Sequence, residues 1–143
     1  MNHLKQIAAK LADYQLDALL VTSEPGEYYA TGFHGEGYVL ITPNKNYYST
    51  DSRYIEAAAA IEGVELTSIN AGKSHLELTV EHVQADGIKA LGIEDGYMSV
   101  AEFGRIRAAL PGDVELVPAQ KLLTDLRAQK YEEERGYMRR AQE

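Results

Sequence analysis

Asp51 and Arg53 are the first residues whose types could do chemistry, because they stand two positions apart where a strand-like run gives way to an alanine-rich helix. Asp51 could act there as a general base, and Arg53 could clamp a substrate carboxylate. The alternative is structural: an aspartate in front of a helix accepts hydrogen bonds from the N–H groups of its first turn. Since capping is the commoner use of aspartate at such a corner, we expect Asp51 and Arg53 to hold the corner together.

The stretch ATGFHGEGYVL, residues 30–40, contains a second candidate site. Its three glycines within six positions interrupt regular structure and predict a surface loop that presents Phe33, His34 and Glu36. A phosphate site is excluded, because the loop has no lysine and leads into a strand instead of a helix amino terminus. An aromatic ring, an imidazole and a carboxylate suit contact with a substrate or partner. A plain surface loop is the open alternative.

No other motif in the chain indicates catalysis or metal binding. His75 and His82 are seven residues apart on one predicted helix, which is too far for one metal ion, and Glu81 beside His82 indicates a solvated helix face. The HExxH, EF-hand, phosphate-loop and GxSxG motifs are absent. The chain has no cysteine, which excludes disulfides, thiolate zinc sites and cysteine nucleophiles. From the residues alone we expect neither a catalytic residue nor a metal ligand.

The bulk composition is that of one globular domain. The chain has 143 residues, of which 45% are apolar and 25% charged. The net charge of −8 opposes binding to nucleic acid and to anionic membranes. The amino terminus lacks the apolar region of a signal peptide, and no apolar stretch approaches the length of a membrane helix, so a cytoplasmic protein is expected.

The elements that would position the candidate residues alternate between helices and strands. Apolar periodicity predicts a first helix over residues 3–14, and Ser-x-x-Glu capping boxes at Ser74 and Ser99 predict two later helices. Another helix is expected from Ser23 or Glu24 to Gly32, and one over SRYIEAAAA, residues 52–60. Strands are predicted at residues 17–22, 37–42, 46–50, 64–69, 89–94 and 114–118. This order predicts a single α/β domain, with a mixed sheet of about five to six strands flanked by helices.

Six tyrosines fall within residues 28–54. Tyrosine combines apolar area with a polar tip, so this clustering suits a half-buried surface or an interface. A sheet face whose hydroxyls reach water fits equally well.

The stretch DALLVTSEPGEYYATGFHGEGYVLITPNKNYYSTDSRYIEAAAA resembles the amino-terminal domain of the creatinase/prolidase family. The shared landmarks are an apolar strand ending in LLVT, then YYATGF, a strand hairpin, and TDSRY with Glu56 behind it. The resemblance implies that residues 1–126 form this domain. It also implies that residues 127–143 are the linker and the start of the first helix of a carboxyl-terminal catalytic domain.

In that family, hydrolysis belongs to the carboxyl-terminal domain, where Asp, His and Glu side chains hold two divalent metals, usually manganese or cobalt. The resemblance therefore assigns no catalytic residue, metal ligand or cofactor to this chain, and we expect it to hydrolyse nothing alone. The expected parent is an Xaa-Pro metallopeptidase, a proline dipeptidase or an aminopeptidase P, that acts on short proline-containing peptides. The alternatives are a stand-alone interaction module of the same fold and the amino-terminal domain of a creatinase-type amidinohydrolase.

The resemblance also implies work for the domain itself. In the family it contributes to a homodimer, and one of its loops approaches the active site of the neighbouring subunit and restricts access to short substrates. The matching loop here presents Phe33, His34 and Glu36, which are the expected substrate-side residues. Asp51, Arg53 and Tyr54 match the family's D-x-R-Y and are expected to form a structural corner. The expected partners are the chain's own catalytic domain and a second subunit.

Overall fold

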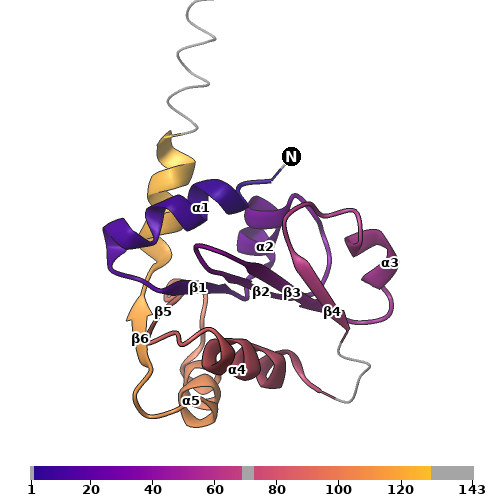
Figure 1. Cartoon of the computed structure of the whole chain (residues 1–143). Coiled ribbons are helices and arrows are strands. Elements are labelled where there is room, and N and C mark those ends of the chain that lie inside the picture. The colour runs from indigo at the N-terminus through magenta and orange to yellow at the C-terminus, as the bar shows by residue number, and fades with distance from the viewer. Residues whose placement is uncertain (1, 69–72, 130–143) are drawn as a thin grey trace, which may run out of the picture.

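The structure, a computed structural model, describes residues 2–68 and 73–129 of the chain (Figure 1). The strands are β1 (Ala18–Val21), β2 (Gly37–Ile41), β3 (Asn46–Thr50), β4 (Glu65–Ser68), β5 (Ala90–Ile93) and β6 (Glu115–Pro118). The helices are α1 (Leu4–Lys10), the 3₁₀ helix η1 (Ala12–Tyr14), α2 (Glu24–Thr31), α3 (Ile55–Ala58), α4 (His75–Ala85) and α5 (Val100–Ala109). Residues 120–129 are helical as well.

The strands form one six-stranded mixed sheet in the order β4-β3-β2-β1-β5-β6. The hairpin predicted around residues 43–45 is confirmed, because β2 pairs antiparallel with β3. β2 is also antiparallel to β1, whereas β1–β5, β5–β6 and β3–β4 are parallel pairs. The predicted α/β class with helices flanking a mixed sheet is confirmed. Each strand lies within one residue of its predicted range, apart from residue 69, which lies outside the described residues.

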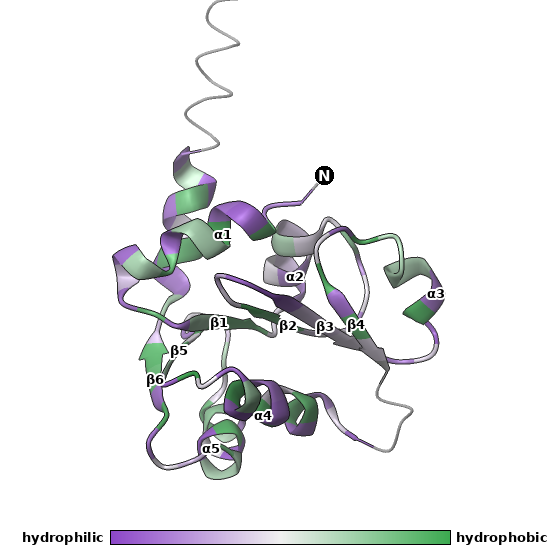
Figure 2. Cartoon of the chain, viewed as in Figure 1, coloured by the Kyte–Doolittle hydropathy of each residue, from purple (hydrophilic) through white to green (hydrophobic). Residues whose placement is uncertain are grey.

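The core has two layers, one on each face of the sheet, because successive side chains of a strand point to opposite faces. On one face, Leu19 of β1 belongs to the same apolar cluster as Leu122 of the helical residues 120–129. On the other face, Leu20 clusters with Val83 of α4. Figure 1 shows α1, α2 and the helical residues 120–129 above the sheet, with α4 and α5 below it. In Figure 2 the central strands β1 and β2 are coloured as hydrophobic between these layers.

The helix ends follow the sequence signals. The side chains of Ser23, Ser74 and Ser99 accept hydrogen bonds from the backbone N–H groups of the first turns of α2, α4 and α5. At the other end of α2, Gly32 adopts a left-handed conformation with φ 74°, which glycine takes without strain. The predicted start and stop of α2 and the serine caps of α4 and α5 are therefore confirmed. The hydrogen bonds between the described residues do not include the return bonds from Glu77 and Glu102 that would complete the predicted capping boxes.

The strand β6 forms one edge of the sheet and ends at Pro118, which pairs with Ile93 of β5. The N–H groups of Glu115 and Ala119 point inward, donating to the carbonyls of Lys89 at 2.7 Å and Ile93 at 2.8 Å. The backbone nitrogens of the alternate residues, Leu116 and Pro118, therefore occupy positions that face away from β5. No helix within the described residues combines the length and the apolarity that crossing a bilayer requires.

Candidate functional site

The glycine-rich loop, residues 32–36, connects α2 to β2. Its first turn is held by Thr31, whose Oγ1 accepts a hydrogen bond from the N–H of Phe33 at 3.1 Å. Gly35 is a buried residue of the loop, and a Cβ at this position would lie 2.8 Å from Oη of Tyr48. This approach is closer than real Cβ contacts, so a larger residue at Gly35 would displace the loop.

The three predicted loop side chains lie on different neighbours. Phe33 is half-buried and packs edge-on against two tyrosines, with ring centroids 6.2 Å from Tyr48 and 6.4 Å from Tyr54. His34 is exposed and stacks on Tyr28 of α2 at 3.9 Å. Aromatic contacts to Tyr28 and to Tyr48 and Tyr54 therefore order the loop, although His34 in it is exposed to solvent.

The corner after β3 is built differently from our expectation. Helix α3 begins after Tyr54 and has no side-chain cap, so the prediction that Asp51 caps this helix is wrong. Asp51 Oδ1 instead accepts from the backbone N–H of Arg53 at 2.9 Å, and the guanidinium of Arg53 reaches Asp51 Oδ2 at 2.7 Å. Asp51 thus closes a tight turn over the two residues that follow it. The helix is also short, since its regular part spans only Ile55–Ala58.

The loop and the corner form one cluster, which the sequence did not indicate. Nη2 of Arg53 lies 2.8 Å from Oε2 of Glu36, and Oγ1 of Thr50 donates to the carbonyl oxygen of Glu36 at 2.8 Å. Together with the contact between Phe33 and Tyr54, these bonds join all the predicted site residues except His34. Hydrogen bonds to Asp51 raise the pKa of Arg53, and the same bonds lower the pKa of Asp51. Both side chains therefore stay charged at neutral pH.

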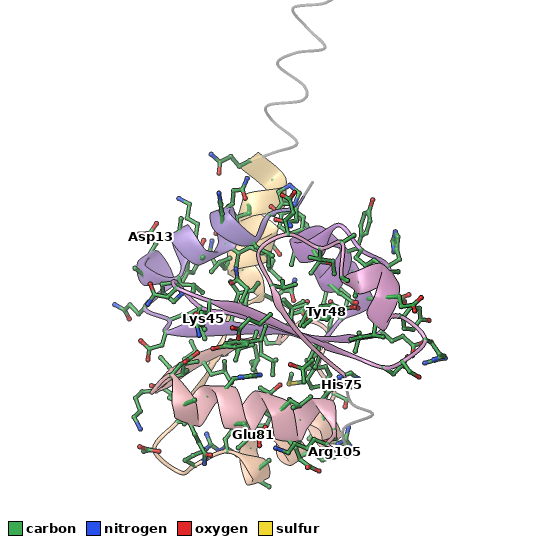
Figure 3. The ribbon with its side chains drawn as sticks, turned by 45° about the vertical axis from the view of Figure 1, so that its right-hand side comes forward. Asp13, Lys45, Tyr48, His75, Glu81 and Arg105 are labelled. Carbon is green, nitrogen blue, oxygen red and sulfur yellow. The ribbon has the colours of Figure 1, made fainter. Side chains whose placement is uncertain are left out.

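A buried carboxyl group that the sequence analysis missed lies under this cluster. Glu27 of α2 is 2% exposed, and its Oε1 accepts a hydrogen bond from the hydroxyl of Tyr48, which is fully buried. Burial raises the pKa of Glu27 to about 7, and burial also raises the pKa of Tyr48. Figure 3 labels Tyr48 on the sheet. Glu27 follows a proline and a glycine in a polar-looking stretch, so nothing in its sequence context signals burial.

A second missed carboxylate, Glu94, holds the start of α2. It is fully buried at the end of β5 and accepts from the backbone N–H groups of Thr22 and Ser23 at 2.7 and 2.9 Å. The hydroxyl of Ser23 donates to its other oxygen at 2.6 Å. The carboxylate therefore satisfies donors where β1 turns into α2, near the positive end of the helix. Its partners Thr22 and Ser23 are 72 and 71 residues away in the chain, so no local sequence pattern signals these contacts.

The two histidines of α4 face the sheet. His75, labelled in Figure 3, lies 2.9 Å from Ser49 Oγ through Nδ1, and His82 stacks on Tyr47 at 3.8 Å. Burial lowers the pKa of both imidazoles. The expectation that His82 belongs to a solvated helix face is therefore wrong for this ring, whereas Glu81 beside it is exposed and pairs with Lys73.

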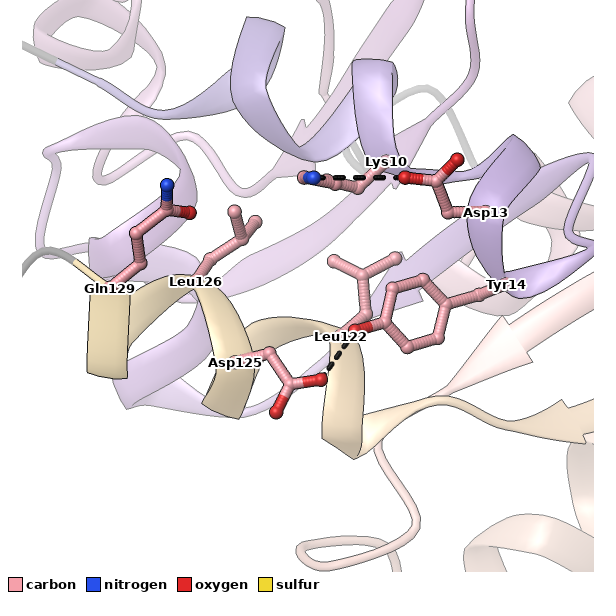
Figure 4. Close-up of a pocket in the computed structure, with 7 residues that line it drawn as sticks. All are labelled: Lys10, Asp13, Tyr14, Leu122, Asp125, Leu126 and Gln129. Carbon is pink, nitrogen blue, oxygen red and sulfur yellow. Dashed lines mark hydrogen bonds and ion pairs between the residues drawn. The ribbon is translucent and has the colours of Figure 1, made fainter.

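Residues 2–68 and 73–129 contain no group of three or more His, Asp or Glu side chains that could hold a metal ion. A separate pocket of about 280 Å³ lies between η1 and the helical residues 120–129 (Figure 4). Tyr14 donates to Asp125 across it, and this bond lowers the pKa of Asp125. These side chains satisfy one another, so the pocket resembles a packing groove more than a reaction site.

Comparison with known proteins gives one consistent family. A family model described as the Creatinase/Prolidase N-terminal domain matches residues 3–129. The uncharacterized peptidase YqhT of Bacillus subtilis (strain 168) is 36% identical over 121 residues, covering 83% of this chain and 33% of that protein. The chain therefore spans about a third of the length of this curated relative.

Solved structures agree with this match. A structure of the aminopeptidase P of Streptococcus thermophilus superimposes with a TM-score of 0.78 at 32% identity, covering 87% of this chain and 95% of that one. The N-terminal domain of the cytoplasmic peptidase PepQ of Mycobacterium tuberculosis H37Rv gives a TM-score of 0.76 at 26% identity, with coverages of 87% and 97%. The fold predicted from the sequence is thus also found in these proteins.

Proposed function

Since the chain belongs to the creatinase/prolidase N-terminal domain family, we propose that it is the non-catalytic amino-terminal domain of a metal-dependent Xaa-Pro peptidase. The observation that carries this proposal is the match over residues 3–129, together with 32% identity to a structure named as an aminopeptidase P. A proline dipeptidase is the first choice of parent and an aminopeptidase P the second. The substrates of the parent are short peptides with proline after the scissile bond.

Catalysis is assigned to a carboxyl-terminal domain of the parent. The described residues of this chain lack a set of side chains that fits a metal ion, so the two manganese or cobalt ions of the proposed enzyme would be held elsewhere. Such ions activate a water molecule for attack on the peptide bond. No chemical step is assigned to Asp51, because its carboxylate is engaged by Arg53.

The glycine-rich loop is the part of this domain that we assign to substrate access. Its outward side chains are an imidazole, a carboxylate and one edge of an aromatic ring, from His34, Glu36 and Phe33. The loop is anchored at Phe33 through Thr31 and at Glu36 through Thr50 and Arg53, so it is held in one shape before any ligand arrives. In a homodimer of the parent, this loop narrows the entrance to the active site of the neighbouring subunit. The domain also contributes to the dimer contact.

The cellular partners follow from the same proposal. They are the chain's own catalytic domain, a second identical subunit and short proline-containing peptides. A cytoplasmic location is supported by the Mycobacterium tuberculosis relative, which is named a cytoplasmic peptidase.

The test compares the whole parent protein with this chain alone. Both are purified, supplied with Mn²⁺, and assayed on an Xaa-Pro dipeptide and on an Xaa-Pro-Xaa tripeptide. The whole protein is expected to cleave at least one of them and the chain alone neither. Cleavage by the chain alone, or no cleavage of either peptide by the metal-loaded whole protein, would contradict the proposal.

The role of the loop is tested by replacing Phe33, His34 and Glu36 with alanine in the whole protein. Each variant is expected to raise KM or to admit longer peptides while kcat changes little, because the loop acts on access instead of chemistry. Glu115→Ala is the matched control, since Glu115 is exposed on the edge strand β6. A loss of kcat without any change in KM or peptide length would contradict an access role.

A stand-alone interaction module remains the second candidate, and the surface of α5 favours it. Val100 is 90% exposed, and Tyr97 and Phe103 are exposed nearby, which gives an apolar surface of the kind that binds proteins. The intact mass of the native protein separates the two functions. A product much heavier than 15.8 kDa supports the peptidase parent, and a product of that mass supports the module.

A further inference from the structure

Glu27 holds the glycine-rich loop at two points through different atoms. Its backbone carbonyl accepts from Thr31 Oγ1 at 2.7 Å, and the same hydroxyl oxygen accepts from the N–H of Phe33. Its carboxylate accepts from the hydroxyl of Tyr48, and Gly35 of the loop packs against that hydroxyl, since a Cβ at Gly35 would lie 2.8 Å from it. The start and the middle of the loop therefore both depend on this one residue.

The carboxylate of Glu27 is also isolated from positive charge. It takes part in none of the ion pairs among residues 2–68 and 73–129, whereas the nearby Arg53 is engaged by Asp51 and Glu36. A buried carboxylate without a cation gains charge only at a cost in desolvation. The titratable groups that act on it are Glu24 on its own helix, Glu36 on the loop and Tyr48 on β3. Glu24 and Glu36 are acidic and oppose its ionisation further.

We propose that Glu27 is a positioning residue whose carboxylate holds the glycine-rich loop through Tyr48, on which Phe33 and Gly35 pack, and whose protonation loosens that loop. A charged carboxylate is a stronger hydrogen-bond acceptor than a neutral carboxyl group. Protonation therefore weakens its attraction for the Tyr48 hydroxyl and frees the loop residues that pack on Tyr48. Because burial raises the pKa of Glu27 to about 7, this change falls within the physiological range of pH.

This inference concerns the loop itself, and only its effect on substrates rests on the proposed function. If the loop restricts access to a neighbouring active site, a loose loop below pH 7 positions short peptides less well and admits longer ones. The peptidase would then lose substrate affinity below pH 7.

The test measures amide hydrogen exchange by NMR on the 143-residue chain, at pH values from 5.5 to 8.5 and corrected for intrinsic exchange. Protection of the Gly35 amide is expected to rise about fivefold on going from pH 6 to pH 8, since hydrogen bonds to charged acceptors are the stronger ones. We call this rise in protection between pH 6 and pH 8 the step. In Glu27→Gln the step should vanish. A wild-type loop whose protection ignores pH, or a step that persists in Glu27→Gln, overturns the proposal.

Two further variants keep the test decisive if Glu27→Gln does not fold. Tyr48→Phe removes the hydroxyl through which Glu27 holds the loop, so the step should vanish. Glu24→Gln removes an exposed acidic neighbour, so the step should move to lower pH. A step that stays in place in both variants counts against Glu27 as its source.

The control variants are His34→Gln and Glu115→Gln. Histidine also titrates near neutrality and His34 lies in the loop, so His34→Gln must retain the step. Glu115 lies on the far edge strand, so its variant must retain the step too. A step lost in His34→Gln assigns the effect to the imidazole and overturns the proposal.

The effect on substrates is measured separately, as the pH dependence of KM in the whole peptidase. The ratio of KM in the wild type to KM in Glu27→Gln is expected to increase below pH 7, while the kcat ratio stays constant. If the protection of Gly35 changes with pH but the KM ratio does not, Glu27 still controls the loop, and the access role of the loop is overturned. If the protection of Gly35 does not change with pH, the proposed role of Glu27 is overturned whatever the kinetics of the peptidase show.

Discussion

Nη2 of Arg53 and Oε2 of Glu36 lie 2.8 Å apart and join two segments that are 17 residues apart in the chain. Glu36 belongs to the glycine-rich loop and Arg53 to the corner after β3. Because Asp51 fixes the other side of the guanidinium, the corner supplies an oriented donor to the loop. The two groups of residues that the sequence presented as separate candidates therefore act as one unit.

Arg53→Ala should change the loop more than the stability. Both partners of the ion pair are 64% exposed, so the pair contributes little to folding and the melting temperature should stay within experimental scatter. In the whole peptidase, the less ordered loop should raise KM about two- to fivefold. Calorimetry and steady-state kinetics measure the two effects. Lys89→Ala is the matched control, because Lys89 forms a similarly exposed pair with Asp113; an equal rise in KM there would refute the link to the loop.

Gly37→Ala should destabilise the fold by at least about 3 kcal/mol, at the upper end of overpacking effects. A Cβ at Gly37 would lie 2.0 Å from the backbone carbonyl oxygen of Ser49 on the paired strand β3, which cannot move without breaking the hairpin. Urea unfolding measures the change. Gly112→Ala is the control, since a Cβ at Gly112 meets nothing within 4 Å. Equal stability of the two variants would show that the hairpin can adjust.

Glu94→Ala should lower the free energy of unfolding by about 3–5 kcal/mol, because the backbone N–H groups of Thr22 and Ser23 would lose their buried acceptor. Glu94→Gln should cost less, because both N–H groups donate to the same oxygen and its amide oxygen can still accept both bonds, while only the acceptor of the Ser23 hydroxyl is lost. Equilibrium urea denaturation of both variants measures the order. A loss below about 1 kcal/mol for the alanine variant would mean that water replaces the carboxylate.

The free energy of unfolding of the chain should depend on pH through Glu27. Its folded pKa of about 7 exceeds the ordinary value of 4.5, so the folded state binds the proton more tightly than the unfolded state. The stability gained from this tighter binding is therefore complete below pH 4.5 and is lost as the pH rises to about 7. Relative to Glu27→Gln, the wild type should lose about 3 kcal/mol across this window and then level off. Urea unfolding at several pH values measures the difference, and parallel curves for the two proteins would contradict it.

His82 should stay neutral to lower pH than an ordinary histidine. Burial against Tyr47 lowers its pKa, so its contribution to stability is present above the unfolded pKa of about 6.5 and is lost as the pH falls through the folded pKa. Titration of the ring protons by NMR measures the midpoint. Tyr47→Leu removes the stacked ring, and the midpoint should return toward the ordinary value. No movement in that variant would locate the cause of the shift elsewhere.

The sheet was predictable because each strand carries its own local signals. The run from Ala18 to Val21 is apolar without interruption, and all four of its side chains are buried. The serine caps and Gly32 are local signals too, since each acts on residues within one turn of itself. These features need no knowledge of distant contacts, and so the order of the elements and the boundaries of the strands could be predicted, whereas the helix expected over residues 3–14 is divided into α1 and η1.

The sequence indicated which residues belong to the candidate site, but not which contacts they make with one another. Whether Asp51 caps a helix or closes a turn depends on where α3 begins, and α3 begins only after Tyr54, three residues beyond Asp51. Glu27 and Glu94 are charged residues whose burial depends on partners far along the chain, Tyr48 in one case and Ser23 in the other. Sequence patterns of period two or three to four cannot reveal such pairs.

Pro118 has a further consequence at the outer edge of β6. In this parallel strand, Glu115 and Ala119 direct their N–H groups to β5, so Leu116 and Pro118 occupy the positions whose N–H groups would face outward. Proline has no N–H, which leaves Leu116 as the single outward donor of the strand. An incoming β-strand from another molecule would find half of the expected ladder missing. Growth of the sheet by strand addition is therefore disfavoured at this edge, which helps to protect the domain against edge-to-edge aggregation.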